Sequence, residues 1–182
     1  MKDEITDPEL IYKLMHPKPA LLVTSVNHEG KANVMACAWA TPVSMEPLLV
    51  LICVAKGHYT SELILRSREF VINIPSKELL KTVWIAGQKS GRDTDKISLT
   101  GIHLTPGKKV DTPSIDECIG HLECELVASL DGGECNIFVG EVVHASADGE
   151  TFSQTWGQDS SVLLHLGGEW FTIPGEVLKA EQ

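Results

Sequence analysis

Aromatic residues, basic clusters and long apolar runs are scarce in this chain, and the last two scarcities argue against particular classes of protein. Only 5% of the 182 residues are aromatic. The longest apolar run, Leu48–Ala55, is far shorter than the roughly 20 residues of a membrane-spanning helix. Acidic residues outnumber Lys and Arg by 25 to 15. No run of basic residues provides the clustered positive charge that binds nucleic acids or anionic membranes. We therefore expect neither a nucleic-acid partner nor a membrane partner.

Common nucleotide and hydrolase motifs are also missing. No Gly-x-Gly-x-x-Gly follows a predicted strand, which argues against a Rossmann unit. Gly101 and Gly107-Lys108-Lys109 approach a P-loop, but five residues rather than four separate the glycines, and no Ser or Thr follows. Neither Gly-x-Ser-x-Gly nor His-Glu-x-x-His occurs. We interpret the glycine-rich stretch as a loop.

Cysteine usage indicates a reducing environment. The five cysteines are odd in number and lie mostly in apolar runs, a pattern typical of reduced thiols in the cytoplasm. The opening residues Met1–Glu4 do not resemble a secretory signal. We therefore expect a cytoplasmic protein without a disulfide framework.

One cysteine cluster could suggest a metal site, Cys118-x-x-His121-x-x-Cys124. On a strand, residues three apart point to opposite faces, and Cys124 shares the apolar face of its neighbours Leu122 and Leu126. A structural zinc site needs about four convergent ligands. We expect Cys124 in the core and no metal site.

Short strands dominate the periodicity, and we predict a single domain over residues 1–182. The capping-box spacing of Thr6 and Glu9 predicts a helix over residues 6–16. Strands are predicted at 20–26, 33–41, 48–54, 69–74, 121–130, 135–145 and 170–173, with helices at 59–67 and 75–86 and a long loop at 87–113. The first two strands should form a hairpin, Pro42 and Pro47 should bracket a connection, and strand 48–54 should be buried on both faces. This order predicts a mainly β protein, an antiparallel barrel with helical additions.

The end of strand 48–54 is the first candidate ligand site. A helix is predicted to begin near Thr60, and a helix N-terminus offers free N–H groups to an anion. Lys56, His58 and the hydroxyls of Thr60 and Ser61 add donors, so the turn could hold a phosphate. The alternative is that Thr60 or Ser61 simply caps the helix.

Two further stretches could contribute. Small residues alternate with larger ones along Asn33–Ser44, which leaves room for a flat ligand beside the strand. Trp39 could stack on that ligand or could be a core aromatic. Lys89–Lys96 carries three basic residues within the long loop and, taken alone, is typical of a solvated surface.

These stretches together resemble the flavin reductase-like family, the FMN-binding split barrels that include flavoredoxin. The resemblance runs from Pro19 to about Trp170. It rests on ordered blocks: Pro19–Thr24, Asn33, Trp39–Ser44, Thr60, Phe70–Pro75, Ser90-Gly91-Arg92-Asp93-x-Asp95-Lys96, Phe138–Val142 and Leu166–Gly168. The related pyridoxamine-phosphate-oxidase-like barrel is an alternative at the level of the fold, and the Ser-Gly-Arg-Asp block favours the flavin reductase branch.

The resemblance implies an antiparallel Greek-key split barrel that forms a homodimer with one FMN per subunit, near the interface. It implies that Met35 to Thr41 run along the isoalloxazine, that Cys53 to Lys56 and Thr60 hold the phosphate, and that Arg92 or Lys96 reaches the flavin or its phosphate. The implied cofactor-binding residues are Asn33, Met35, Ala36, Cys37, Ala38, Trp39, Thr41, Cys53, Val54, Ala55, Lys56, Thr60, Arg92 and Lys96. No side chain is expected to act as a general acid or base, because FMN itself carries the redox chemistry.

Three functions remain open. The first is an NAD(P)H-dependent flavin reductase, with FMN as bound group or as substrate and NAD(P)H in an open groove. The second is an electron carrier of flavoredoxin type, which passes electrons between redox protein partners. The third is a non-enzymatic split-barrel binding module. Bleaching of a bound flavin by NADH or NADPH alone distinguishes the first from the other two.

Overall fold

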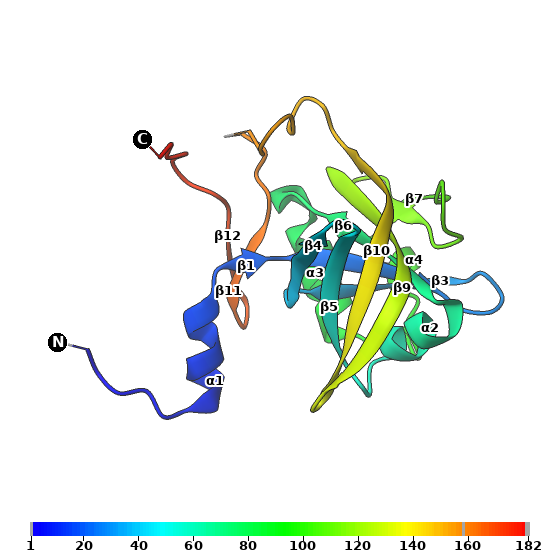
Figure 1. The fold of residues 1–182 in the computed structure, drawn as a ribbon, viewed down its shortest axis with the longest axis horizontal. Helices are drawn as coiled ribbons and strands as arrows, with labels where there is room; N and C mark the ends of the chain where they lie inside the picture. The colour runs from blue at the N-terminus through cyan, green and yellow to red at the C-terminus, as the bar shows by residue number, and fades with distance from the viewer. Residues whose placement is uncertain (1, 158, 181–182) are drawn as a thin grey trace.

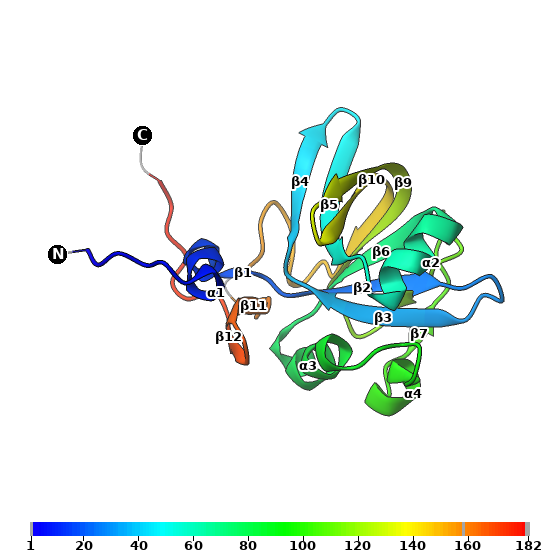
Figure 2. The same ribbon diagram turned by 90° about the horizontal axis from the view of Figure 1, so that it is seen from below.

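One curled antiparallel sheet forms the body of the molecule, and it confirms the predicted mainly β class (Figures 1 and 2). The computed structural model describes residues 2–157 and 159–180. In spatial order, the seven strands are β3 (Ala32–Cys37), β2 (Leu21–Val26), β6 (Glu69–Ile74), β9 (Gly120–Gly132), β10 (Cys135–Ala147), β5 (Leu48–Ala55) and β4 (Ala40–Met45).

The two edge strands of this sheet, β3 and β4, are neighbours in the sequence. Only Ala38 and Trp39 connect them, so the sheet must curl until its two edges approach each other. No ladder joins β3 to β4 among the described residues, and the barrel therefore stays open along this line. This opening is the split of a split barrel, and the candidate site lies beside it.

Helices and two small sheets surround the body. They are α2 (Tyr59–Ser67), η2 (Lys77–Leu79), α3 (Leu80–Gln88), α4 (Lys96–Thr100), the pair β7 (Leu104–Thr105) and β8 (Ser114–Ile115), and the terminal elements α1 (Pro8–Ile11), η1 (Tyr12–Met15), β1 (Lys18–Pro19), β11 (Leu164–Gly167) and β12 (Trp170–Thr172). Figure 2 shows α3 and α4 beneath β3, and α1 with the small β1–β11–β12 sheet to one side of the body. None of the described helices is long and apolar enough to cross a membrane.

Two apolar clusters hold these layers together. Val23, Ile52 and Phe70 lie in the cluster inside the curled sheet. Leu22 lies in the second cluster, which also contains Val83 of α3. Successive strand residues point to opposite faces, so β2 contributes to both clusters, with Leu21 and Val23 in the first and Leu22 in the second, and is buried on both sides.

Several predicted elements have other boundaries. The helix predicted over 6–16 is a short α-helix followed by a 3₁₀ turn, and its N-cap is Asp7 rather than Thr6, because the Asp7 carboxylate accepts the Glu9 N–H. The strand predicted over 33–41 is two strands, β3 beside β2 and β4 beside β5. Pro42 therefore lies within an edge strand, beside a bulge, rather than at the start of a connection.

The predicted double-sided burial of β5 is also wrong. Val50, Ile52 and Val54 are buried, whereas the alternate residues, Leu51 and Cys53 among them, are only half-buried. Hairpin β9–β10 and helix α2 lie where the sequence predicts them.

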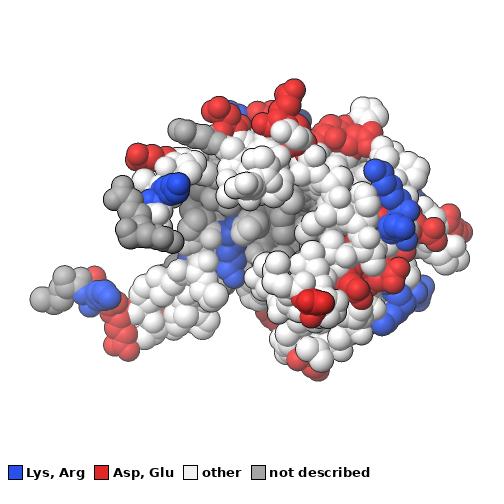
Figure 3. All heavy atoms as spheres, turned by 45° about the horizontal axis from the view of Figure 1, so that its top comes forward, with Lys and Arg blue, Asp and Glu red and all other residues white. Residues whose placement is uncertain are grey.

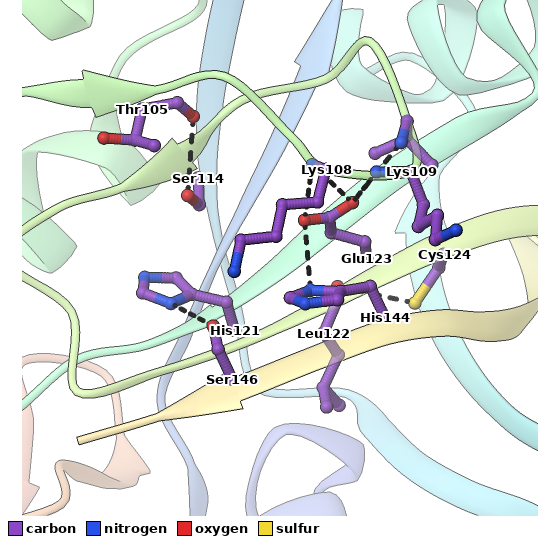
Figure 4. A network of polar contacts seen from close by, with 11 residues as sticks. Thr105, Lys108, Lys109, Ser114, His121, Leu122, Glu123, Cys124, His144 and Ser146 are labelled. Atoms are coloured by element: carbon purple, nitrogen blue, oxygen red, sulfur yellow. Dashed lines mark hydrogen bonds and ion pairs between the residues drawn. The ribbon is translucent and has the colours of Figure 1, made fainter. Parts of the chain in front are cut away.

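The predicted long loop over 87–113 is more ordered than its polar composition indicates. Helix α3 extends into it, and α4 begins where the Asp95 carboxylate accepts the Ser98 N–H. Its last part, residues 108–112, is fastened by two carboxylates. Glu123 accepts N–H groups from Lys108, Lys109 and Val110, and Glu69 accepts those of Asp111 and Thr112. Figure 4 shows Glu123 reaching from β9 to this loop, with His144 of β10 on its other side.

Candidate functional site

A hollow opens where the barrel is split. We call it the split hollow, and its volume is about 250 Å³. It is lined by Tyr12, Met35, Ala36, Cys37, Ala38, Trp39, Cys53, Val54, Ala55, His58 and His165. The structure thus brings together the end of β3 and the end of β5, as the candidate flavin residues predict. The alanine side chains leave space for a flat ring against the strands.

Trp39 lies at this hollow rather than in the core. Its side chain is 41% exposed, which excludes the alternative of a buried core aromatic. The Tyr12 ring lies 6.0 Å from the Trp39 ring, and the Lys18 ammonium lies 5.8 Å from its centroid. A ring that enters the hollow therefore meets an aromatic rim.

The thiols beside this hollow are neutral at physiological pH. Burial raises the pKa of Cys37 to about 12, and burial also raises the pKa of Cys53. Neither thiol is a thiolate, so neither is poised as a nucleophile or a metal ligand. They contribute small apolar surface to the walls.

A second hollow adjoins the first at the start of α2. We call it the α2 hollow, and its volume is about 280 Å³. It shares Met35, Ala36 and His58 with the split hollow, and its other lining residues are Asn33, Gly57, Tyr59, Thr60, Ala86, Gly87, Gln88, Lys89, Ser90, Gly91 and Lys96. A molecule with a flat ring and an anionic tail could therefore lie across both hollows.

The N-terminus of α2 points its uncapped end toward this second hollow. The N-cap residue is His58, whose side chain makes no capping hydrogen bond. Thr60 lies inside the helix, where its hydroxyl accepts a hydrogen bond from the Asn33 amide at 2.9 Å. Ser61 accepts from Asn136 at 2.8 Å. The simple capping alternative is therefore wrong. The Ser61 N–H donates to the His58 carbonyl at 3.0 Å, and the N–H groups of Tyr59 and Thr60 remain available to an anion.

Lys96 is a buried cation without a carboxylate partner among the described residues. Its side chain lines the α2 hollow, the residue is 5% exposed, and its ammonium donates only to the Ala86 carbonyl at 3.2 Å. Burial lowers the pKa of Lys96 to about 8. A buried charge normally requires a partner, so this site fits a bound anion.

Asn33 adds a second unsatisfied group. Its side chain is 6% exposed, and its Oδ1 atom has no hydrogen-bond partner among the described residues. A Cβ atom on Gly91 would lie 2.0 Å from that oxygen, so the loop can approach Asn33 only because residue 91 is glycine. An unpaired acceptor cannot bind a phosphate directly. The Asn33 amide instead donates to the Thr60 oxygen, which leaves the Thr60 O–H free to donate to an anion such as the phosphate end of FMN.

Three candidate residues lie outside both hollows. The Lys56 ammonium pairs with Asp131 at 2.9 Å on the exposed hairpin turn. Arg92 pairs with Glu62 at 2.8 Å, stacks over the Tyr59 ring and lines a neighbouring hollow. Thr41 is exposed on edge strand β4.

Residues from the chain ends complete the split hollow, and sequence reasoning missed them. Tyr12 and His165 line it because β1 pairs with β11, which places Lys18 beside His165. No local pattern marks either residue. Their positions depend on a pairing between the two ends of the chain.

The structure places His121 and Cys124 in different surroundings. No cluster of three or more potential ligands occurs among the described residues. His121 contacts the Ile115 carbonyl and the Ser146 hydroxyl, while Cys124 is fully buried in the core.

The fold is a split barrel, and two adjoining hollows lie at its split. The family model of the flavin reductase like domain matches residues 13–173. The chain therefore belongs to the flavin reductase-like family, and the predicted split-barrel fold is confirmed.

Relatives and solved structures agree with this assignment. An uncharacterized protein of Pyrococcus abyssi is 41% identical over 174 residues, covering 93% of this chain and 98% of that protein. Flavoredoxin from Methanosarcina acetivorans superposes with a TM-score of 0.87 at 30% identity, covering 99% and 95%. An FMN-binding domain of a flavin reductases-like enzyme from Shewanella baltica superposes with a TM-score of 0.81 at 26% identity, covering 97% and 96%. A flavin reductase (NADH) of Kitasatospora aureofaciens is 26% identical, covering 70% of this chain and 64% of that protein. Similarity to FMN-binding proteins supports flavin binding here.

Proposed function

We propose that this chain is an FMN-binding oxidoreductase of the flavin reductase type, which takes electrons from NADH or NADPH. One observation carries the proposal. A hollow lined by Ala36, Ala38 and Ala55 shares three lining residues with a second hollow, which is lined by the buried Lys96 and by the start of α2, where no side chain caps the helix. FMN has the matching shape, a planar ring joined by a short chain to a phosphate.

In this proposal each hollow holds one end of the cofactor. Met35 to Trp39 and Cys53 to Ala55 lie along the ring. Thr60 and Lys96 hold the phosphate together with the N–H groups of Tyr59 and Thr60, and Asn33 orients the Thr60 hydroxyl. FMN supplies the redox chemistry when bound, and the chain positions the ring, provides charge near the phosphate and lines the ring with apolar side chains.

Arg92, Thr41 and Lys56 take lesser parts. Arg92 stays close enough to act on the phosphate end, because its hollow shares Asn33 and Lys96 with the α2 hollow. Thr41 and Lys56 would reach the cofactor only after a change in side-chain position.

We further propose one flavin reductase-like domain, a homodimer and a cytoplasmic location. Five free cysteines support a reducing compartment. Exposed apolar residues on the terminal segments and on hairpin β4–β5, such as Leu14, Met45 and Trp170, support a partner subunit. Neither a nucleic acid nor a membrane is part of the proposal. On the face in Figure 3, basic and acidic side chains are interspersed.

The second candidate function is an electron carrier of flavoredoxin type. The similarity to the Methanosarcina flavoredoxin over nearly the whole chain favours it. The nicotinamide then plays no part, and a redox protein delivers the electrons.

An anaerobic titration followed in the visible flavin bands tests both candidates. The protein, reconstituted with FMN, is mixed with NADPH and then with NADH. Rapid bleaching by either nucleotide is the expected result. Bleaching by dithionite alone would favour the carrier, and failure to bind FMN would overturn both.

A further inference from the structure

Lys96 differs from the other described lysines because the fold encloses its side chain. Helices α3 and α4 pack against each other beneath β3 (Figure 2). Lys96 is the first residue of α4, and its ammonium reaches α3, where it donates to the Ala86 carbonyl. The residue is 5% exposed, whereas every other described lysine is half-buried or exposed. Its burial therefore sets it apart as a candidate for specific chemistry.

The surroundings of Lys96 leave part of its population uncharged. Lys96 lines the α2 hollow and also the neighbouring hollow of about 380 Å³, which Lys31 and Arg92 line as well. Lys31 and Arg92 each pair with a carboxylate, at 3.9 and 2.8 Å, but Lys96 has no carboxylate partner among the described residues. Burial lowers the pKa of Lys96 to about 8, so at pH 8 about half of these groups are neutral amines. A neutral lysine amine is a nucleophile.

The α2 hollow also carries donors that suit a phosphate. The N–H groups of Tyr59 and Thr60 lie at the start of α2, and the Thr60 hydroxyl is free to donate because its oxygen accepts from the Asn33 amide. Met35 and Ala36 give the same hollow apolar surface. The hollow therefore suits a small molecule in which a phosphate is joined to a short apolar group.

We propose that Lys96 is a site of acylation by small acyl phosphates such as acetyl phosphate, and that the α2 hollow directs the reaction by holding the phosphate. This inference rests on the proposed function, because the same donors are assigned to the phosphate of FMN. In an acyl phosphate, a single oxygen atom joins the phosphorus to the carbonyl carbon. An amine beside the phosphate therefore also lies beside the carbon that it attacks.

The reaction needs no oxidant or reductant. The neutral Nζ atom of Lys96 attacks the carbonyl carbon, a C–N bond forms, and the bond from that carbon to the bridging oxygen breaks. Inorganic phosphate leaves and takes up the proton that Nζ loses. The product is an uncharged amide whose remaining N–H can still donate to the Ala86 carbonyl. Acylation thus removes a buried charge, and it also removes the cation proposed to bind FMN.

Two reagents that transfer the same acetyl group test the proposal on the wild-type chain without cofactor. Acetyl phosphate carries a phosphate, and acetic anhydride does not. Peptide mass spectrometry gives the initial acetylation rates of Lys96 and of the exposed Lys77. The ratio of these rates should be about tenfold larger with acetyl phosphate, the factor that one hydrogen bond to a charged group gives. Equal ratios for the two reagents would show that amine reactivity alone decides, and would overturn the proposal.

A pair of variants locates the phosphate. Thr60→Val removes a hydroxyl from the α2 hollow and should lower the ratio with acetyl phosphate but not with acetic anhydride. Ser61→Ala is the matched control, because Ser61 is the next residue of the same helix but does not line the hollow. Equal effects of the two variants would contradict the assignment. The comparison of reagents on the wild-type chain decides the matter even where Thr60→Val fails to fold.

Protection by FMN separates this inference from the proposed function. Saturating FMN should block acetylation of Lys96 by acetyl phosphate and should leave Lys77 unprotected. Normal FMN binding together with equal ratios for the two reagents would overturn this inference alone. A larger ratio with acetyl phosphate in a chain that does not bind FMN would reject the proposed function, and Lys96 would then be an acylation site beside a phosphate site without a flavin.

Discussion

Backbone N–H groups converge on an anion position in two regions, and the chain treats the two regions differently. In the 108–112 loop, the chain supplies the anions itself, because Glu123 and Glu69 accept five consecutive N–H groups. At the α2 hollow, the helix N-terminus and the buried Lys96 have no carboxylate partner among the described residues. The first arrangement is complete without a ligand, and the second is not.

The N–H groups of residues 108–112 are satisfied within the fold, whereas Lys96 and the start of α2 have no carboxylate partner among the described residues. Glu123 remains ionised although it is 4% exposed. Burial alone would raise its pKa, but the N–H groups of Lys108, Lys109 and Val110 outweigh burial and lower it. Lys96 has no such compensation, and burial lowers its pKa to about 8. Substitutions in the two regions should therefore have opposite effects on the protein without cofactor.

Removal of the Glu123 carboxylate should have the largest effect. Glu123→Ala leaves three N–H groups and His144 without their acceptor, and we expect the free energy of unfolding to fall by about 3 kcal/mol or more. Urea denaturation measures this change. Glu125→Ala is the control, because Glu125 lies two residues along the same strand and is exposed. Equal losses in the two variants would contradict the role of Glu123.

The same carboxylate should govern stability in acid. Because its pKa is lowered in the folded state, its contribution is complete above the ordinary value of 4.5 and is lost as the pH falls through the folded value. The wild-type protein should therefore lose stability below pH 4.5 more steeply than Glu123→Ala. Parallel acid limbs in urea titrations would count against this assignment.

Lys96→Met should give the reverse pattern. Removing a buried charge that has no carboxylate partner should leave the cofactor-free protein as stable as before or more stable. FMN affinity should weaken by about 1.5–3 kcal/mol, the loss of a hydrogen bond to a charged group. Flavin fluorescence titration measures the affinity, and Lys77→Met on the exposed surface is the control. Destabilisation without a loss of affinity would make Lys96 a structural residue.

The pH dependence of Lys96 sharpens the same comparison. Its folded pKa of about 8 lies below the ordinary 10.5, so the unfolded chain binds the proton more tightly between these values. Without FMN, the contribution of Lys96 to the free energy of unfolding should rise with pH between about 8 and 10.5 and should not change below pH 8. Lys96→Met should lack the rise. Saturating FMN should move the rise to higher pH, because a phosphate favours the charged lysine.

Local pattern predicted the elements that their own apolar periodicity and turn residues mark. Helix α2, strand β6 and hairpin β9–β10 were predicted close to their observed bounds. The break between β3 and β4 was missed, because residues 33–41 read as one strand and only the pairing of β4 with β5 divides them. The order in residues 108–112 was missed because it depends on carboxylates from distant strands. Helix α4 was missed although its N-cap, Asp95, is a local signal.

The candidate site shows the same limit. The residues on β3 and after β5 were predicted together, and the structure brings most of them into the two hollows. Tyr12 and His165 could not be predicted, because the pairing of β1 with β11 joins the two ends of the chain. Composition alone suggested a solvated surface for Lys96, yet that residue is buried.

Gly91→Ala should have a smaller effect that is confined to the α2 hollow. The added Cβ would collide with Asn33 Oδ1 and must push the loop away from it. We expect FMN affinity to weaken by about 1 kcal/mol, the lower end of the cost of overpacking, because this loop is largely exposed. Gly149→Ala is the control, since no atom lies near its Cβ position and its φ is not positive. Isothermal titration with FMN should distinguish the two alanine variants.

Lys56→Ala should have the smallest effect, and it tests whether every lysine near the α2 hollow is a phosphate ligand. Lys56 already has an anion, Asp131, at 2.9 Å on an exposed turn. Exposed ion pairs contribute little, so FMN affinity should change by less than about threefold. A tenfold loss would mean that Lys56 leaves Asp131 when the cofactor binds. In that case Asp131→Asn should strengthen FMN binding, because the lysine would no longer have to break an ion pair. If Lys56→Ala has the expected small effect and Lys96→Met the larger one, the difference reflects whether each lysine already has an anion before the cofactor binds.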